Sequence, residues 1–288
     1  MLINPHLRRI DWALNQPSFL NLENSAQYFQ SPAHQAKIDA ILNALDQNPS
    51  RVNDYFDSLP PMPLGRYFEQ LLFYILDQDP FYKVHWENKQ IVDEQGITRG
   101  EIDLILENAA GEIEHWEIAL KYYLQVQNSP DHLHYIGPSR KDFLAKKMKR
   151  LFENQLKQSK SPLALSEFGE IPSKVFLKGE LYFPNSQSGL RPQNFNAQAN
   201  IYEWIPFSEF KKLKSKDSYF KVLFKPDWLG PYLCKEATSL TSFENLLEEL
   251  QKLFDELYRP QMIIEARQEN DYFVEDKRVF VLPPNWPA

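Results

Sequence analysis

Apolar residues recur along the chain with two different spacings, and the change of spacing marks a block of strands between helices. Repeats every three or four positions predict amphipathic helices, whereas alternating or short continuous apolar runs predict strands. The helical ranges are 6–58, 64–76 and about 139–158, and the strand ranges are 81–93, 100–107 and 112–124. A turn at 108–111 joins the last two strands. The middle of the chain is therefore predicted to run helix, three strands, helix.

The second half of the chain has a less regular pattern. A strand is predicted at 175–183, and the polar stretch 185–198 predicts a loop. Ser242 is placed to cap a helix with a strongly apolar face, and late strands are predicted at 262–264 and 279–282. We therefore expect three parts, namely an N-terminal helical segment at 1–60, a central α/β part at 61–160 and a C-terminal α+β region at 161–288.

Composition is that of an ordinary globular protein, with 43% hydrophobic and 25% charged residues. The single cysteine, Cys234, excludes an intrachain disulfide framework and a cysteine-based zinc cluster. The longest apolar runs are about six residues, far too short to span a membrane. The N-terminus also lacks the charged and then apolar pattern of a signal peptide. We expect a cytoplasmic protein with no membrane partner.

The net charge of −7 counts against a protein that binds nucleic acid over its whole surface. The charge is uneven, however, because basic residues outnumber acidic ones between 137 and 160. A local basic cluster directly after the central strands predicts contacts to a polyanion, and a solvated helix face is the alternative. The predicted nucleic-acid contacts are Arg140, Lys141, Lys146, Lys147, Lys149 and Arg150.

Charged residues interrupt two of the predicted strands. Asp103 lies within an otherwise apolar run, and Glu117 and Lys121 share one face of the strand 112–124, because alternate residues of a strand face the same side. Burying a carboxylate without a partner costs several kcal/mol, on the order of the stability of a whole domain. A divalent cation is the simplest single partner for two such carboxylates. Glu69, at the margin of the apolar face of the preceding helix, is a candidate third acid.

This combination of residues suits metal-dependent phosphodiester hydrolysis. That reaction needs a metal to polarise the phosphoryl group and acidify a water, carboxylates to hold the metal, and a cation to stabilise the developing negative charge. Mg²⁺ is held by one or two carboxylates with several waters retained, so that two or three acids suffice. The candidate catalytic residues are Glu69, Asp103, Glu117 and Lys121, with the three acids as ligands to Mg²⁺ or Mn²⁺.

The same residues carry a resemblance to known families. The segments 64–69 (LGRYFE), 100–103 (GEID) and 117–121 (EIALK) resemble the core of the PD-(D/E)XK nuclease superfamily, which includes restriction endonucleases, Holliday-junction resolvases and recombination exonucleases. Most of the chain, including 135–138 (YIGP) and 177–184 (LKGELYFP), more closely resembles a bacterial family catalogued as domain of unknown function 1853. The latter family brings no established activity.

The superfamily resemblance implies a fold and a substrate. It implies a restriction-endonuclease-like α/β core at 61–160, with a mixed sheet flanked by helices. By position, Asp103 and Glu117 would be metal ligands and Glu69 the acid carried by the helix. DNA is expected as the substrate on this analogy alone.

The chain departs from the superfamily pattern at the lysine. The pattern places a lysine two residues after the second acid, where this chain has Ala119, and Lys121 follows two residues later. Lys146, on the following helix, is a rival for the role, and Gln155 is either a substrate contact or a solvated side chain. Two alternatives to a nuclease stay open. One is a catalytically inactive nuclease fold that binds nucleic acid or a protein partner, and the other is a structural network in which the acids pair with Lys121 and Arg99.

Overall fold

The computed structural model of the chain describes residues 1–93, 95–184, 189–213 and 218–287. Its contacts divide the chain into two compact units, each assembled from separate stretches of sequence. Unit 1 comprises Met1–Lys121, Ala145–Gly179 and Asn194–Ala199, and unit 2 comprises Tyr122–Leu144, Glu180–Gln193 and Asn200–Ala288. The division of the chain into 1–60, 61–160 and 161–288 stays a prediction.

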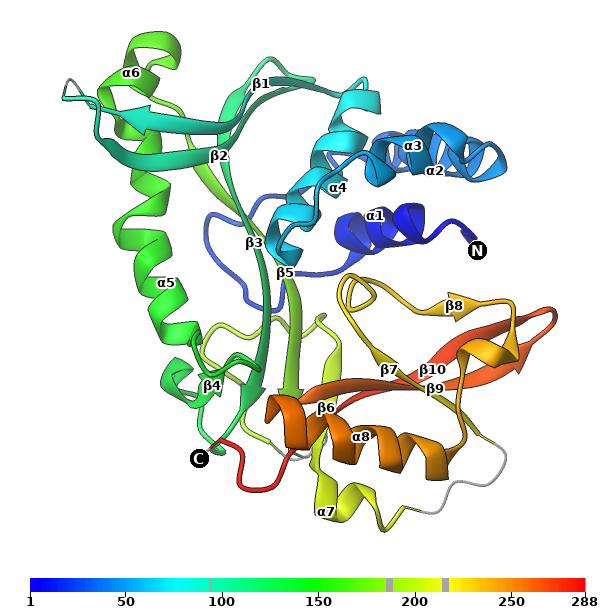
Figure 1. The fold of residues 1–288 in the computed structure, drawn as a ribbon. Helices are drawn as coiled ribbons and strands as arrows, with labels where there is room; N and C mark the ends of the chain where they lie inside the picture. The colour runs from blue at the N-terminus through cyan, green and yellow to red at the C-terminus, as the bar shows by residue number, and fades with distance from the viewer. Residues whose placement is uncertain (94, 185–188, 214–217, 288) are drawn as a thin grey trace. The chain divides into compact units, whose positions relative to one another are not determined.

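Unit 1 begins with four helices (Figure 1). They are α1 (Pro5–Asn15), α2 (Pro32–Gln47), α3 (Ser50–Asp57) and α4 (Leu64–Gln78). Side chains fix the first two starts, because Asn4 accepts hydrogen bonds from the backbone at the start of α1 and Ser31 does so for α2. Proline stands in the first turn of both helices, where it removes no intrahelical hydrogen bond. The helical pattern predicted over 6–58 is thus present as three separate helices.

Three strands follow, as the sequence predicts; in the structure they are antiparallel, and the last of them ends in unit 2. They are β1 (Tyr82–Val92), β2 (Thr98–Asn108) and β3 (Ile113–Gln125). The turn between β2 and β3 depends on Asn108, whose side-chain oxygen accepts from the backbone of Ala110 and Glu112, and on Gly111 with φ of 78°. This turn sets the register of the two strands that carry Asp103 and Glu117.

Shorter helices and one long strand complete unit 1. They are α5 (Leu144–Glu153), the 3₁₀ helix η2 (Gln155–Lys160), α6 (Pro162–Phe168) and β5 (Ser173–Phe183), the last of which ends in unit 2. The single helix expected at about 139–158 is therefore wrong in its bounds. Residues 137–142 form a turn in which Gly137 N donates to Asp142 O and Arg140 has φ of 62°, a backbone conformation that a helix cannot contain.

The core of unit 1 lies between α4 and the central strands. Phe176 of β5 packs between Phe68 of α4 and Trp116 of β3, with ring centroids 6.2 Å and 5.6 Å apart. Since successive strand residues face opposite sides, Glu117 lies on the face of β3 opposite to Trp116. At the far end of α4, the fully buried pair of His34 and Asp79 joins α2 to this core at 2.7 Å.

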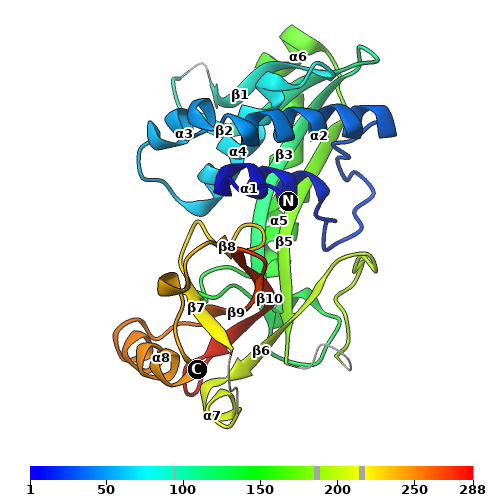
Figure 2. The same ribbon diagram turned by 90° about the vertical axis from the view of Figure 1, so that its right-hand side faces the viewer.

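Unit 2 is built around a second set of strands (Figure 2). Its strands are β4 (Tyr135–Ile136), β6 (Ile201–Pro206), β7 (Tyr219–Leu223), β8 (Leu233–Cys234), β9 (Gln261–Glu269) and β10 (Tyr272–Leu282). Its helices are η1 (His132–His134), α7 (Phe207–Phe210), η3 (Ala237–Ser239) and α8 (Phe243–Leu257), the last capped by Ser242 as predicted. The late strands at 262–264 and 279–282 are the apolar parts of a longer hairpin, β9–β10, whose polar outer half gave no strand pattern. Residues 185–188 of the predicted loop lie outside the described residues.

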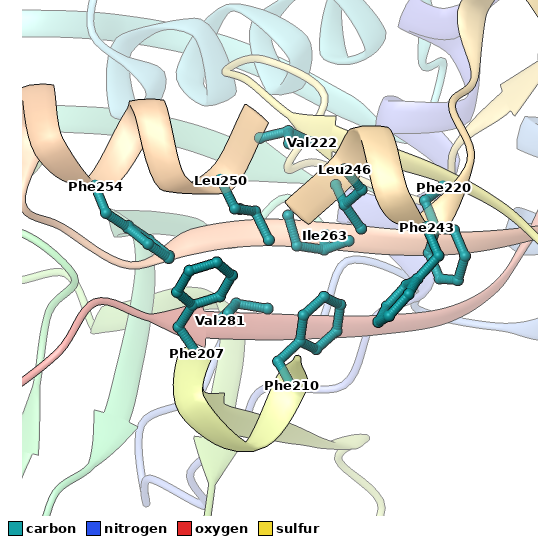
Figure 3. Packing of buried hydrophobic residues seen from close by; sticks show 10 residues of the cluster. All are labelled: Phe207, Phe210, Phe220, Val222, Phe243, Leu246, Leu250, Phe254, Ile263 and Val281. Atoms are coloured by element: carbon teal, nitrogen blue, oxygen red, sulfur yellow. The ribbon is translucent and has the colours of Figure 1, made fainter. Parts of the chain in front are cut away.

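The core of unit 2 is strongly aromatic. Helix α8 and the short α7 place their apolar side chains on β7, β9 and β10 (Figure 3). Beside this cluster, Arg278 of β10 is buried against Glu180 at 3.0 Å and Glu275 at 2.8 Å, which supplies the buried guanidinium with counter-charges.

Taken together, the described part of the chain is a mixed α/β protein with a ten-stranded mixed sheet flanked by helices. The strands follow the order β1-β2-β3-β5-β6-β10-β9-β7, with β4 beside β3 and β8 beside β10. Among the described residues, no helix is both long enough and apolar enough to cross a membrane.

Candidate active site

One pocket of unit 1 gathers the residues that the sequence singles out. It has a volume of about 580 Å³ and is lined from α4, β2, β3, α5 and η2. All four predicted catalytic residues line it, so residues up to 52 positions apart in the sequence (69 to 121) meet at one place. The charged residues of its lining are Arg66, Glu69, Arg99, Glu101, Asp103, Glu117, Lys121, Lys147 and Arg150.

Asp103 and Glu117 lie at the centre of the charged lining. Leu104 of β2 pairs with Trp116 of β3. Because these strands are antiparallel, the adjacent residues Asp103 and Glu117 lie opposite each other. Both residues are buried, with 9% and 1% of their surface exposed. Asp103 Oδ2 accepts a hydrogen bond from the backbone N–H of Ile118 at 2.9 Å, which orients its carboxylate along β3. Two carboxyl groups therefore face each other away from water.

The charge state of this pair follows from its surroundings. Burial and the neighbouring Asp103 raise the pKa of Glu117 to about 8, against the opposing effect of Lys147. Burial also raises the pKa of Asp103, while the Ile118 N–H and Lys147 oppose the rise. The Glu117 Oε2 atom is buried and has no hydrogen-bond partner in the described structure. A buried, unsatisfied carboxyl oxygen is costly, so this atom marks a position where a ligand would be favourable.

Lys147, on α5, contacts Glu117. Its Nζ lies 3.4 Å from Glu117 Oε1 and 2.9 Å from Gln155 Oε1. The Gln155 amide in turn donates to Glu117 Oε1, which closes a three-membered network of side chains. Burial lowers the pKa of Lys147, and Lys121 lowers it further, whereas Glu117 and Asp103 raise it.

The sequence predicts Lys147 as a nucleic-acid contact and its neighbour Lys146 as the rival of Lys121. The structure places Lys146 on the exposed side of α5. A signal for Lys147 was present in the helical spacing. Leu144, Met148 and Leu151 are buried on one face of α5. Lys147 follows Leu144 by three positions and precedes Leu151 by four, so it shares this face.

Lys121 and Ala119 also line the pocket from β3. Ala119 is buried at 4% exposure, and Lys121 is half-buried. The backbone of Lys121 lies directly against Gly179 of β5, so the end of this site is packed on a neighbouring strand. The pocket therefore contains two lysines, Lys121 from a strand and Lys147 from a helix.

Glu69 lies at the wall of the pocket, where it binds Arg66, and its role as a metal ligand stays a prediction. Its Oε2 accepts from Arg66 Nη1 at 2.7 Å, and the same guanidinium donates to Glu101 Oε1 at 2.6 Å. Burial and Asp103 raise the pKa of Glu69, whereas the Arg66 hydrogen bond lowers it. Arg66 and Glu101 were not among the site residues predicted from the sequence. Their signals were the i, i+3 spacing of Arg66 and Glu69 and the shared strand face of Glu101 and Asp103.

The described residues contain no group of three or more His, Cys, Asp and Glu side chains arranged to hold a metal ion. Glu69 is turned toward Arg66, so the two facing carboxyls of Asp103 and Glu117 are the acids available as a pair. Two carboxylates with retained waters are an ordinary Mg²⁺ site, whereas a protein site with three or four side-chain ligands is not present in the described part of the chain.

Comparisons with known proteins identify the family of the chain. A family model described as "Domain of unknown function (DUF1853)" matches residues 8–282. The chain belongs to the DUF1853 family. Comparisons with curated proteins and with solved structures gave no match.

The predicted basic contacts of this DUF1853 chain separate into groups. Lys147 and Arg150 line the pocket, and Lys146 and Lys149 are exposed elsewhere on α5, where Lys149 lies 4.0 Å from Glu153. Arg140 and Lys141 are exposed residues of unit 2. Their binding to nucleic acid stays a prediction.

Proposed function

We propose that this DUF1853 chain is a Mg²⁺- or Mn²⁺-dependent nuclease that hydrolyses phosphodiester bonds, with DNA as its expected substrate, and that unit 1 contains a PD-(D/E)XK-like core. The observation that carries the proposal is the pair of facing, buried carboxyls of Asp103 and Glu117, with Glu117 Oε2 unsatisfied. The succession of α4, three antiparallel strands and α5 supports the proposed core, since these elements carry all four predicted catalytic residues and Lys147.

The residues present fit a hard divalent cation. Carboxylate oxygens are the ligands that Mg²⁺ prefers, and Mg²⁺ keeps several waters when only one or two carboxylates bind it. A cation held by Asp103 and Glu117 would give Glu117 Oε2 a partner and would favour the ionised form of both groups. When bound, the cation would polarise a phosphoryl oxygen and lower the pKa of a coordinated water. The pocket volume of about 580 Å³ leaves room for waters and a phosphate group.

The remaining residues of the pocket supply binding and orientation. Lys147 would stabilise negative charge that develops on the phosphate, and Gln155 holds the Lys147 ammonium in place through its 2.9 Å contact. Arg66 is held by Glu69 and Glu101 at the pocket wall, where a guanidinium suits a phosphate of the substrate backbone. Arg150, exposed at the same pocket, would bind a neighbouring phosphate.

A second candidate function is a nuclease-like fold that binds nucleic acid or a protein partner without cleaving it. The specific observation in its favour is that Glu117 Oε1 already contacts Lys147 and the Gln155 amide. In that case the acids and Lys147 form a structural network, and a cation would have to compete with an existing ion pair.

Metal titration distinguishes the two functions. Mg²⁺ and Mn²⁺ would be titrated into the wild type and into Asp103→Ala/Glu117→Ala, and heat release and thermal stability would be followed. The matched control is Asp77→Ala/Glu153→Ala, which removes two exposed carboxylates. We expect saturable binding in the wild type and the control and its loss in the site variant. Absence of binding to the wild type, both alone and with a non-hydrolysable DNA, would contradict the metallonuclease and favour the binding protein.

The two adjacent lysines of α5 provide a test of the chemistry. Lys147→Met is expected to lower DNA cleavage by roughly 10²-fold or more, because it removes the ammonium beside the acids. Lys146→Met removes an exposed lysine one residue away and is expected to change cleavage by less than about threefold. Single-turnover cleavage with saturating Mg²⁺ measures both. Equal losses in the two variants would show that α5 contributes general charge only.

A further inference from the structure

A second pocket of unit 1 has a lining unlike that of the candidate active site, with which it shares no residue. It has a volume of about 400 Å³ and is formed by the end of α1, the segment 17–29, β5 and residues 196–198. Its polar lining consists almost entirely of neutral groups, among them Gln16, Gln27, Gln35, Asn196 and Gln198. A volume of this size is within the range of about 300–1,000 Å³ found for small-molecule sites.

Lys178 of β5 is the one charged residue in the described lining of this pocket. It is 8% exposed, its Nζ donates to the backbone oxygen of Gln16, and it lies 4.7 Å from the centre of the Phe176 ring. Among the described residues, no carboxylate forms an ion pair with it. By contrast, Arg278 of β10, which is also deeply buried, has two carboxylates beside it.

A buried ammonium without a counter-charge is unfavourable, and a protein that keeps one gains from a ligand that supplies the charge. Burial alone lowers the pKa of Lys178 to about 7, so the side chain is close to half protonated at neutral pH. An anion would restore its charge. The neutral amides around it offer N–H donors to such a ligand and bring no repelling carboxylate.

We propose that this pocket binds a small molecule with an oxyanion group, a phosphate or a carboxylate, which pairs with the Lys178 ammonium while the surrounding amides contact the polar remainder. The site is independent of the proposed nuclease activity and does not require it. The segment LKGELYFP around Lys178 belongs to the family resemblance, and the candidate active site does not use this lysine.

The test uses the full chain, with inorganic phosphate and acetate as separate probes at about pH 6.5. Binding would be followed by calorimetry and by nuclear magnetic resonance in the wild type, Lys178→Met and Lys147→Met. Lys147→Met removes a partly buried lysine from the other pocket and so reports phosphate that binds there. We expect at least one probe to bind the wild type and Lys147→Met saturably, and Lys178→Met to bind it at least about tenfold more weakly. The probe that binds more tightly identifies the anion class.

The affinity of the wild type should fall as the pH rises from about 6 to about 8.5, because the free protein loses the Lys178 proton over this range. Protection from an amine-specific reagent gives a readout that needs no variant. Phosphate or acetate should slow modification of Lys178 and leave the exposed Lys37 unaffected. The proposal is overturned if neither probe binds saturably, if Lys178→Met binds as the wild type does, or if only Lys147→Met loses binding.

Discussion

At the scale of single residues, the groups around Glu117 act on its pKa in opposite directions. Its carboxyl is buried opposite Asp103, one oxygen contacts Lys147 and Gln155, and the other oxygen has no partner. The sequence predicted that Asp103 and Glu117 would meet, because a carboxylate within an apolar strand needs a partner and the neighbouring strand is the nearest source. It could not predict which cation would contact them, since that depends on the distance between α5 and β3.

The buried acids predict a stability that depends on pH. The pKa of Glu117 rises from 4.5 to about 8 in the folded chain, so over this window the folded state binds a proton that the unfolded state releases. The free energy of unfolding should therefore fall as the pH rises through the window. Glu117→Gln removes this dependence and should stabilise the metal-free protein at about pH 8, by on the order of several kcal/mol. Urea unfolding at several pH values measures it.

The exposed Glu153→Gln is the control for this measurement, and it should follow the pH profile of the wild type. A wild-type stability that rises between about pH 5 and about 8, and that Glu117→Gln lowers, would contradict the prediction. That result would instead show that the ion pair with Lys147 outweighs the repulsion between the two acids, as the structural alternative requires. Saturating Mg²⁺ should reverse the pH trend of the wild type if the acids bind the ion.

At the scale of elements, α5 shows that a site residue can be assigned only when the buried face of its helix is known. The sequence predicted a basic amphipathic helix in this region but began it at about residue 139, within a turn. The choice of Lys146 from the sequence did not use the apolar spacing of the helix, which already separates Lys146 from Lys147. The buried positions Leu144, Met148 and Leu151 settle this face, and they place Lys147 beside Glu117.

The approach of β5 to β3 depends on a single glycine. A Cβ atom at Gly179 would overlap the backbone carbonyl oxygen of Lys121, and its φ of 132° is rarely adopted by other residues. Because the obstacle is backbone, no side-chain rotation can relieve it. Gly179→Ala should therefore lower the free energy of unfolding by at least about 3 kcal/mol. Urea unfolding followed by circular dichroism would show this loss.

Gly65 gives the matched control, since it lies in α4 at the same candidate site with nothing within 4 Å of its added Cβ. Gly65→Ala should leave stability unchanged or raise it by about 0.5–1 kcal/mol, as alanine favours a helix. If Gly179→Ala were as stable as Gly65→Ala, the close contact between β5 and Lys121 would not exist in solution.

At the scale of the whole molecule, the grouping of segments is what the sequence could not predict. Local periodicity identified most helices and strands, including α4, β2, β3 and α8. This periodicity does not indicate which segments, far apart in the sequence, pair in the fold. The stretch 194–199, for example, joins unit 1 through hydrogen bonds of Asn194 O with Asn21 N and of Asn196 N with Phe19 O, at 2.7 Å and 3.1 Å. Nothing in its polar sequence indicates that partner.

The composition of unit 1 leads to a prediction about fragments. The central part 61–160 contains Glu69, Asp103, Glu117, Lys121 and Lys147, yet it lacks β5 and the first three helices. Without β5, the Phe176 ring that packs between Phe68 and Trp116 is missing. Without α2, the buried Asp79 loses His34. The loss of β5 exposes apolar side chains that are buried in the full chain, and the loss of α2 leaves a buried carboxylate without its partner.

We therefore expect the fragment 61–160 to show no cooperative thermal transition and no near-ultraviolet circular dichroism, and to bind Mg²⁺ only weakly. The full chain with Phe176→Ala is the milder comparison. It should keep a cooperative transition at a cost of about 3–5 kcal/mol, because the cavity affects packing without removing a strand. A sharp transition in the fragment would mean that the central strands and α4 suffice for folding. The candidate active site would then be a part of the chain that folds without β5, and Gly179 would have no role in shaping it.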